Sequence, residues 1–100
     1  MPPVGTVTDL AERLRALGDR TRLQIVFALA AEGVHELCVC DLSTLVGVTD
    51  SAVSHSLRTL RQLGMVRFRK VGQIAYYALA DGEVGDLVRS GAEHMRYRES

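Results

Sequence analysis

Apolar side chains recur every three or four residues along the first third of the chain, which is the period of an amphipathic helix. One stripe spans residues 7–17 and a second spans residues 23–30. Each stripe is long enough to predict a helix that turns one face toward a protein core. The residues expected to cap or end these helices are Thr6 or Thr8 and Gly18 for the first, and Asp19 and Gly33 for the second.

Two shorter helices are predicted next, joined by a tight turn. Apolar residues at positions 42, 45 and 46 predict a helix of about two turns, and those at 53, 57 and 60 predict a longer helix that ends at Gly64. The connection is Gly47–Val48–Thr49, in which Gly47 ends the first helix and Thr49 caps the second. Two helices joined by such a turn are typical of a helix-turn-helix.

The hydrophobic period changes from helical to two between Met65 and Leu79. Gly72–Gln73 separates two alternating stretches, so this segment is predicted to form a β-hairpin whose first strand is basic. Asp81 then opens a last helix, with an apolar stripe over residues 84–95. The predicted fold is mainly α with a β-hairpin wing, a winged helix-turn-helix with added N- and C-terminal helices that form a dimer.

The composition is that of one small folded domain. The 100 residues are 47% hydrophobic and 24% charged, which suffices for one core and predicts a single domain over residues 1–100. The longest apolar run, Ile25–Ala31, is far shorter than the ~20 residues that span a bilayer, and no signal segment opens the chain. We therefore expect a cytoplasmic protein without a membrane partner. A partner subunit is expected because so short a chain buries only part of its surface.

The charges are segregated along the chain, although the formal net charge is zero. Residues 32–50 hold four acids and no Lys or Arg, whereas residues 51–80 hold five basic residues and no acid. The basic residues are Arg58, Arg61, Arg67, Arg69 and Lys70. This basic block covers the second helix of the helix-turn-helix and the hairpin, which indicates one face suited to phosphates.

Double-stranded operator DNA is the partner that this arrangement predicts. In a winged helix the second helix of the pair fits the major groove, and the hairpin lies along the backbone or in the minor groove. Ser contacts phosphates or base edges, and Arg can bind guanine with two hydrogen bonds. The predicted DNA-binding residues are Asp50, Ser51, Ser54, His55 and Arg58 on the helix, and Arg67, Arg69, Lys70 and Gln73 on the hairpin. The alternative is a winged-helix module that binds another protein.

An enzyme is not expected. His55 shares a predicted helix with Ser51 and Ser54, which is the only arrangement that suggests a nucleophile. No third group and no pocket-forming loop supports it.

The two cysteines, Cys38 and Cys40, indicate metal or redox chemistry. A disulfide between residues two apart is strained, so reduced thiols are expected. The positive end of the helix that follows favours thiolates, which select soft ions such as cadmium, lead, zinc or arsenite. In a regular helix the two side chains would point about 200° apart, so joint binding needs a nonhelical first turn. A purely structural pair of small residues and a thiol redox sensor stay open.

Three runs of residues resemble the ArsR/SmtB family of metal-sensing repressors. Residues 16–23 (ALGDRTRL) look like its second-helix signature, residues 36–42 (ELCVCDL) like its cysteine metal box, and residues 51–58 (SAVSHSLR) like its recognition helix. The resemblance covers nearly the whole chain. It implies a homodimer that binds operator DNA and is released when a soft metal ion binds.

The resemblance implies a main metal site at Cys38 and Cys40. Arsenite sensors similar to this chain add a third cysteine where it has Ser43. Cadmium and lead sensors add cysteines from an N-terminal arm that contains none here. His35, Asp41, water or a residue of the other subunit would then complete the site.

A second metal site of the family lies on the last helix, between two subunits. The positions of this chain that align with it are Asp81, Glu83, His94 and Tyr97, of which the first three carry metal-binding side chains. Alternatively, Asp81 caps the helix and His94 is a surface residue near its end.

Overall fold

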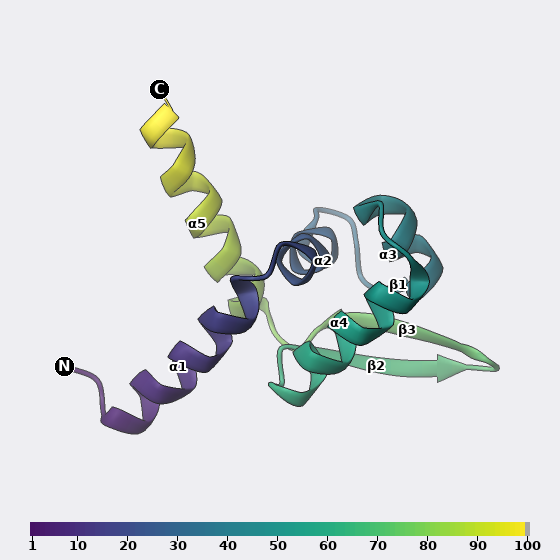
Figure 1. The fold of residues 1–100 in the computed structure, drawn as a ribbon, viewed down its shortest axis with the longest axis horizontal. Coiled ribbons are helices and arrows are strands. Elements are labelled where there is room, and N and C mark those ends of the chain that lie inside the picture. The colour runs from purple at the N-terminus through teal and green to yellow at the C-terminus, as the bar shows by residue number, and fades with distance from the viewer. Residues whose placement is uncertain (100) are drawn as a thin grey trace.

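The computed structural model describes the backbone of residues 1–99 and the side chains of residues 1–96. This part of the chain forms a mainly helical fold with a protruding hairpin (Figure 1). The elements are α1 (Val4–Leu17), α2 (Arg20–Ala30), β1 (Leu37–Cys38), α3 (Val39–Val46), α4 (Asp50–Gln62), β2 (Val66–Val71), β3 (Ile74–Leu79) and α5 (Gly82–Glu99). The predicted winged helix-turn-helix, with one extra helix at each end, is confirmed.

The turn of the helix-turn-helix forms as the sequence predicts. Gly47 follows α3 with a φ of 79°, a left-handed conformation that glycine adopts without strain. The Thr49 hydroxyl accepts a hydrogen bond of 3.1 Å from the amide of Ala52 and so caps α4. These two residues fix the angle at which α4 leaves α3.

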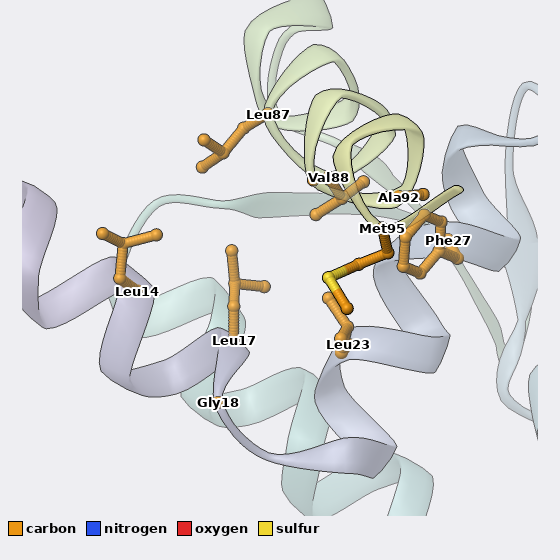
Figure 2. Close-up of a pocket in the computed structure, with 10 residues that line it drawn as sticks. Leu14, Leu17, Gly18, Leu23, Phe27, Leu87, Val88, Ala92 and Met95 are labelled. Atoms are coloured by element: carbon orange, nitrogen blue, oxygen red, sulfur yellow. The ribbon is translucent and has the colours of Figure 1, made fainter. Parts of the chain in front are cut away.

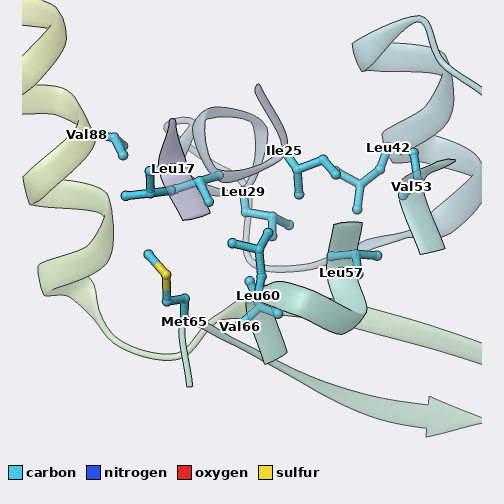
Figure 3. Packing of buried hydrophobic residues seen from close by; sticks show 11 residues of the cluster. Leu17, Ile25, Leu29, Leu42, Val53, Leu57, Leu60, Met65, Val66 and Val88 are labelled. Carbon is cyan, nitrogen blue, oxygen red and sulfur yellow. The ribbon is translucent and has the colours of Figure 1, made fainter. Parts of the chain in front are cut away.

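One hydrophobic core holds the helix-turn-helix, the hairpin and α5 together (Figure 3). Ile25 of α2, Leu42 of α3 and Leu57 of α4 are fully buried in it. The buried cluster consists of Leu17, Ile25, Val26, Leu29, Leu42, Val53, Leu57, Leu60, Met65, Val66 and Val88. Because α4 buries its apolar face here, its polar face is turned outward.

The sheet has a third strand that the sequence analysis missed. Its strand order is β1-β3-β2, and β1 pairs with β3 through Leu37 opposite Tyr77 and Cys38 opposite Tyr76. A strand of two residues is too short to show an alternating pattern, so its signal is absent from the sequence. The strand brings Cys38 against the middle of β3.

Two predicted helix boundaries are wrong. Helix α1 begins after Pro3 and has no side-chain cap, and the Thr8 hydroxyl donates to the Val4 carbonyl inside the helix. Proline is suited to a helix start because its φ is already close to helical. Helix α2 ends at Ala30, ahead of the expected Gly33, while the Asp19 cap is confirmed by a bond of 3.0 Å from the Arg22 amide.

Helices α1 and α5 extend away from the core on the side opposite the hairpin (Figure 1). Most of the apolar stripe of α1 is left uncovered by the described residues: Val7, Leu10 and Leu14 are 46–49% exposed, and only Leu17 of the stripe is buried in the core. Among the described residues, no helix is long and apolar enough to cross a membrane.

Candidate nucleic-acid interface and thiol site

The outward face of α4 carries every helix residue predicted to contact DNA. Burial of Val53, Leu57 and Leu60 orients the helix, and the opposite side is left to polar residues. Asp50, Ser51, Ser54, His55 and Arg58 are all exposed. The structure therefore brings these five predicted residues together on one surface.

The two faces of the hairpin divide the predicted wing residues. Phe68 lies opposite Tyr77, and the Arg61 guanidinium of α4 lies 4.6 Å from the centre of the Phe68 ring, so this face is turned toward α4. Side chains alternate along a strand, which places Lys70 on the same face as Phe68. Arg67 and Arg69 take the opposite face.

Arg67 lines a shallow hollow of about 320 Å³ together with residues of α2 and α5, including Arg89. This hollow is on the side of the sheet that faces away from α4. Gln73 sits in the exposed turn at the tip of the wing. The predicted wing residues thus point to different faces of the sheet. Strand periodicity alone did not show which of these faces is turned toward α4.

Arg69 is bound by an acid that the sequence analysis did not consider. Its guanidinium donates to both carboxylate oxygens of Glu36, with Nε at 3.1 and 3.0 Å, and stands 5.5 Å from the Tyr76 ring centre. The hydrogen bonds lower the pKa of Glu36 and raise the pKa of Arg69 from their ordinary values. Both groups are therefore charged at neutral pH and occupied with one another.

The cysteines lie where β1 passes into α3. Cys38 is the residue before the helix and has extended backbone angles, with φ −85° and ψ 168°. Cys40 lies in the first turn of α3 and is exposed. The nonhelical start that joint metal binding requires is therefore present. The Cys38 thiol donates to Oδ2 of Asp41 at 3.3 Å, which places one oxygen ligand beside the sulfur.

The described part of one chain does not by itself supply a complete metal site. No group of three or more His, Cys, Asp and Glu side chains within the described part of the chain is arranged to hold a metal ion. Cys38, Cys40 and Asp41 are close in sequence and offer two sulfur donors and one oxygen donor. This set suits part of the coordination shell of a soft ion.

The α5 residues are separated within one chain. Asp81 caps the helix by accepting from the amides of Glu83 at 3.0 Å and Val84 at 3.2 Å. His94 is exposed and lies eleven residues after Glu83, which is roughly 16 Å along a helix. A metal site from these residues requires a second subunit. The side chain of Tyr97 lies outside the described residues.

An apolar groove of about 480 Å³ opens between α1, α2 and α5 (Figure 2). Leu14 and Leu17 of α1, Phe27 of α2, and Leu87 and Met95 of α5 point toward it. With Leu14 48% exposed and Met95 53% exposed, much of this surface contacts only solvent in the isolated chain.

Comparison with known proteins identifies relatives over most of the chain. Residues 19–67 match the arsR family of bacterial regulatory proteins. A transcriptional repressor SmtB homolog from Synechocystis is 47% identical over 88% of this chain and 64% of its own length. A cadmium resistance transcriptional regulatory protein CadC homolog from Staphylococcus aureus is 41% identical over 88% of this chain and 71% of its own length. This chain thus spans roughly two thirds of each regulator.

A solved structure shares the fold. It is the homodimeric winged helix-turn-helix DNA-binding domain of a possible ArsR-family transcriptional regulator from Mycobacterium bovis. The two structures align with a TM-score of 0.78 at 29% identity, over 93% of this chain and 87% of that one. The fold and the relatives are those of transcriptional regulators and not of enzymes.

Proposed function

Because this chain belongs to the arsR family of bacterial regulatory proteins, we propose that it is a metal-responsive repressor. It binds operator DNA as a homodimer inside the cell and leaves the DNA when a soft metal ion binds. The observation that carries the proposal is the position of the thiols: Cys38 and Cys40 begin α3, and only residues 47–49 separate α3 from the recognition helix α4.

The DNA-binding surface in this proposal is the polar face of α4 together with the hairpin. Helix α4 enters the major groove, where Ser54, His55 and Arg58 reach base edges and Ser51 reaches a phosphate. Lys70 and Gln73 approach the backbone from the wing. Asp50, at the first position of α4, accepts from cytosine amino groups. Residues 1–100 act as one domain.

The homodimer in this proposal forms through α1 and α5. Their exposed apolar residues surround a groove that a second copy can fill, and burial of apolar area is the main driving force for such association. The homodimeric structure of the same fold supports a homodimer, and the exposed stripes are the ground for placing its interface at α1 and α5. Two copies related by a twofold axis present their α4 helices to half-sites one helical turn apart.

Cys38 and Cys40 bind the metal as thiolates, with Asp41 or a donor from the partner subunit completing the coordination. Cys38 and Cys40 would hold a soft ion through strong bonds to sulfur, and this would fix the junction between β1 and α3 in one geometry. Cadmium, zinc and lead accept this mixed set of sulfur and oxygen donors. Arsenite is less well served, because Ser43 stands where a third cysteine would be needed. The names of the relatives include cadmium resistance, which supports an ion of this class.

Release follows if the metal-bound geometry of α3 displaces α4. The packing of α3 against α4 through Leu42 and Val53 transmits a change at the cysteines to the recognition helix. The expected coupling is about 1–3 kcal/mol, and by reciprocity operator DNA weakens metal binding by the same factor.

The test is a titration of reduced protein with cadmium, zinc, lead and arsenite, recording thiolate-to-metal absorption and DNA anisotropy in the same sample. We expect one or more ions to produce the absorption band and to release DNA at the same stoichiometry. DNA release by peroxide in metal-free protein, without release by any metal, would favour the redox sensor instead.

A further inference from the structure

A hollow of about 340 Å³ lies between α4 and the hairpin, lined by Ser54, Leu57, Arg58, Arg61 and Tyr77. We propose that this hollow binds a phosphate group of the DNA backbone and that Arg61 is its principal ligand. The sequence places Arg61 in the basic block of residues 51–80 but not among the individual residues predicted to contact DNA. The inference deepens the proposed function and rests on it, because the phosphate belongs to the same DNA.

The lining of the hollow has the chemistry of an anion site. The guanidinium of Arg61 and the hydroxyl of Tyr77 are the donors that it offers to a phosphate, while Ser54 and Arg58, which the proposed function assigns to base edges, form its other polar side. None of its lining residues carries a carboxylate, and residues 51–80 contain no Asp or Glu. Guanidinium groups and hydroxyls are the usual donors to phosphate oxygens.

Arg61 is held in place by an aromatic pair. Its guanidinium carbon lies 4.6 Å from the centre of the Phe68 ring. Phe68 stacks on Tyr77 with ring centres 5.6 Å apart and planes inclined by 28°. A cation over a ring face is attracted by the ring quadrupole, and its N–H groups remain available at the edge of the guanidinium. The pair thus restricts Arg61 without using its hydrogen bonds.

The exposure of Phe68 fits this role. The side chain is 40% exposed although it is large and apolar. Its packing against the Arg61 guanidinium accounts for an aromatic ring at this surface position. Arg69, by contrast, is one strand position away and is neutralised by Glu36 on the other face of the sheet. In the described part of the chain, no ion pair involves Arg61.

The position of Arg61 points to the backbone and not to a base. Recognition helices contact base edges mainly through their N-terminal residues, and Arg61 is in the last turn of α4, where the helix meets the wing. A phosphate in the hollow would lie between the end of α4 and the hairpin. We therefore expect Arg61 to contribute equally to all DNA sequences.

The experiment measures binding of a labelled random-sequence duplex by fluorescence anisotropy over a series of KCl concentrations. Wild type is compared with Arg61→Ala, Arg61→Gln, Phe68→Leu and Arg15→Ala. Arg15 is an exposed cation of α1 that lies off its apolar stripe and serves as the charge-matched control. Thermal unfolding followed by circular dichroism verifies that each variant is folded.

Both Arg61 variants should bind more weakly, with the slope of log affinity against log salt reduced by about one, as for one lost phosphate contact. Phe68→Leu should lower affinity about two- to fivefold with the slope unchanged, since the charge is kept and only its placement is lost. Arg15→Ala should match wild type.

If wild type binds DNA and the folded Arg61 variants show the same slope of log affinity against log salt, the phosphate site is overturned and the proposed function stays intact. An unchanged affinity in Phe68→Leu overturns the role of the aromatic pair. A reduced slope in Arg15→Ala equal to that of Arg61→Ala shows that any lost cation has this effect, and it overturns the assignment to the hollow. A wild type that binds no DNA refutes the proposed function, and the inference with it.

Discussion

The recognition surface and the thiol site differ in how much of each one chain supplies. On α4 the predicted residues are fixed by a buried apolar face and stand together on one exposed side. At the β1–α3 junction two sulfurs and one carboxylate are present, and further donors have to come from elsewhere. Under the proposed function, the described part of one chain therefore supplies the whole DNA-binding face of α4, whereas it supplies only part of the metal site.

Disruption of the proposed dimer contact should have the largest effect on DNA binding, because a monomer presents only one α4 helix to the operator. Leu14→Glu places a charge on the exposed apolar stripe of α1, which costs little in the folded monomer and prevents two stripes from meeting. We expect a monomer by sedimentation equilibrium. Loss of the second half-site should weaken DNA binding about 10²- to 10⁴-fold, the gain that linked binding events provide.

The control for Leu14→Glu is Arg15→Ala, which leaves the apolar stripe intact. A wild-type protein that is monomeric at micromolar concentration and still binds operator at full strength would contradict the dimer. Retained dimerisation in Leu14→Glu would move the interface to another surface.

Replacing the cysteines separates the two regions directly. Cys38→Ser with Cys40→Ser should leave DNA affinity unchanged, since neither residue lies on the polar face of α4, and should abolish the response to cadmium. In wild type, metal is expected to lower operator affinity about 5- to 150-fold, and this metal-dependent change should be absent from the double variant. Anisotropy with and without metal measures both quantities.

The matched control is Glu83→Gln with His94→Ala on α5, which should respond to metal like wild type. If the cysteine variant still leaves the DNA on metal addition while the α5 variant does not, the sensor is the site around Asp81, Glu83 and His94.

The order of elements and most helix boundaries could be predicted from the sequence because each has a local signal, whereas the start of α1 and the end of α2 were predicted wrongly. Asp19, Gly47 and Thr49 act within a few residues of themselves, and the structure confirms all three. Strand β1 and the pairing of Arg69 with Glu36 join residues more than thirty positions apart. Such contacts depend on how the elements pack, which a periodic pattern does not encode.

The same limit applies to the candidate site. The polar residues of α4 could be assigned because the helical period sets which side is buried. The hairpin pattern showed that Arg67 and Arg69 share a face, but which face meets α4 became clear only from the contact between Arg61 and Phe68. Arg61 carried a signal in the sequence as a member of the basic block of residues 51–80, and Tyr77 carried one as an aromatic residue of the second hairpin strand. Neither signal showed that the two side chains line one hollow.

Within the recognition surface, base contacts and phosphate contacts should separate. Arg58→Ala should cost about 1–3 kcal/mol on a tight-binding duplex selected from a random pool and should relax base preference. Lys70→Ala should weaken all sequences alike and lower the salt slope by about one. The sequence places both Arg67 and Lys70 among the DNA-binding residues of the hairpin, but Arg67 faces away from α4, so Arg67→Ala should have the smaller effect of the two.

Paired measurements on the selected and the random duplex verify this division. Equal losses on both duplexes for Arg58→Ala would make Arg58 a backbone contact. No change for any of the three variants would place the DNA on another face of the protein.

The smallest expected effect concerns the contact that joins the two regions. Glu36 belongs to the cysteine segment and Arg69 to the wing, and in metal-free protein the ion pair occupies the arginine. Arg69→Ala should therefore lower DNA affinity less than Lys70→Ala does, because a neutralised cation releases few counterions from DNA. Glu36→Gln should raise DNA affinity slightly and steepen its salt dependence, since it frees Arg69 while Cys38 and Cys40 remain.

Salt titrations of the three variants measure the difference. An equal loss of affinity in Arg69→Ala and Lys70→Ala would mean that DNA takes Arg69 from Glu36 on binding. In that case the thiol segment and the wing are linked through this ion pair, and the coupling to metal should fall in Glu36→Gln.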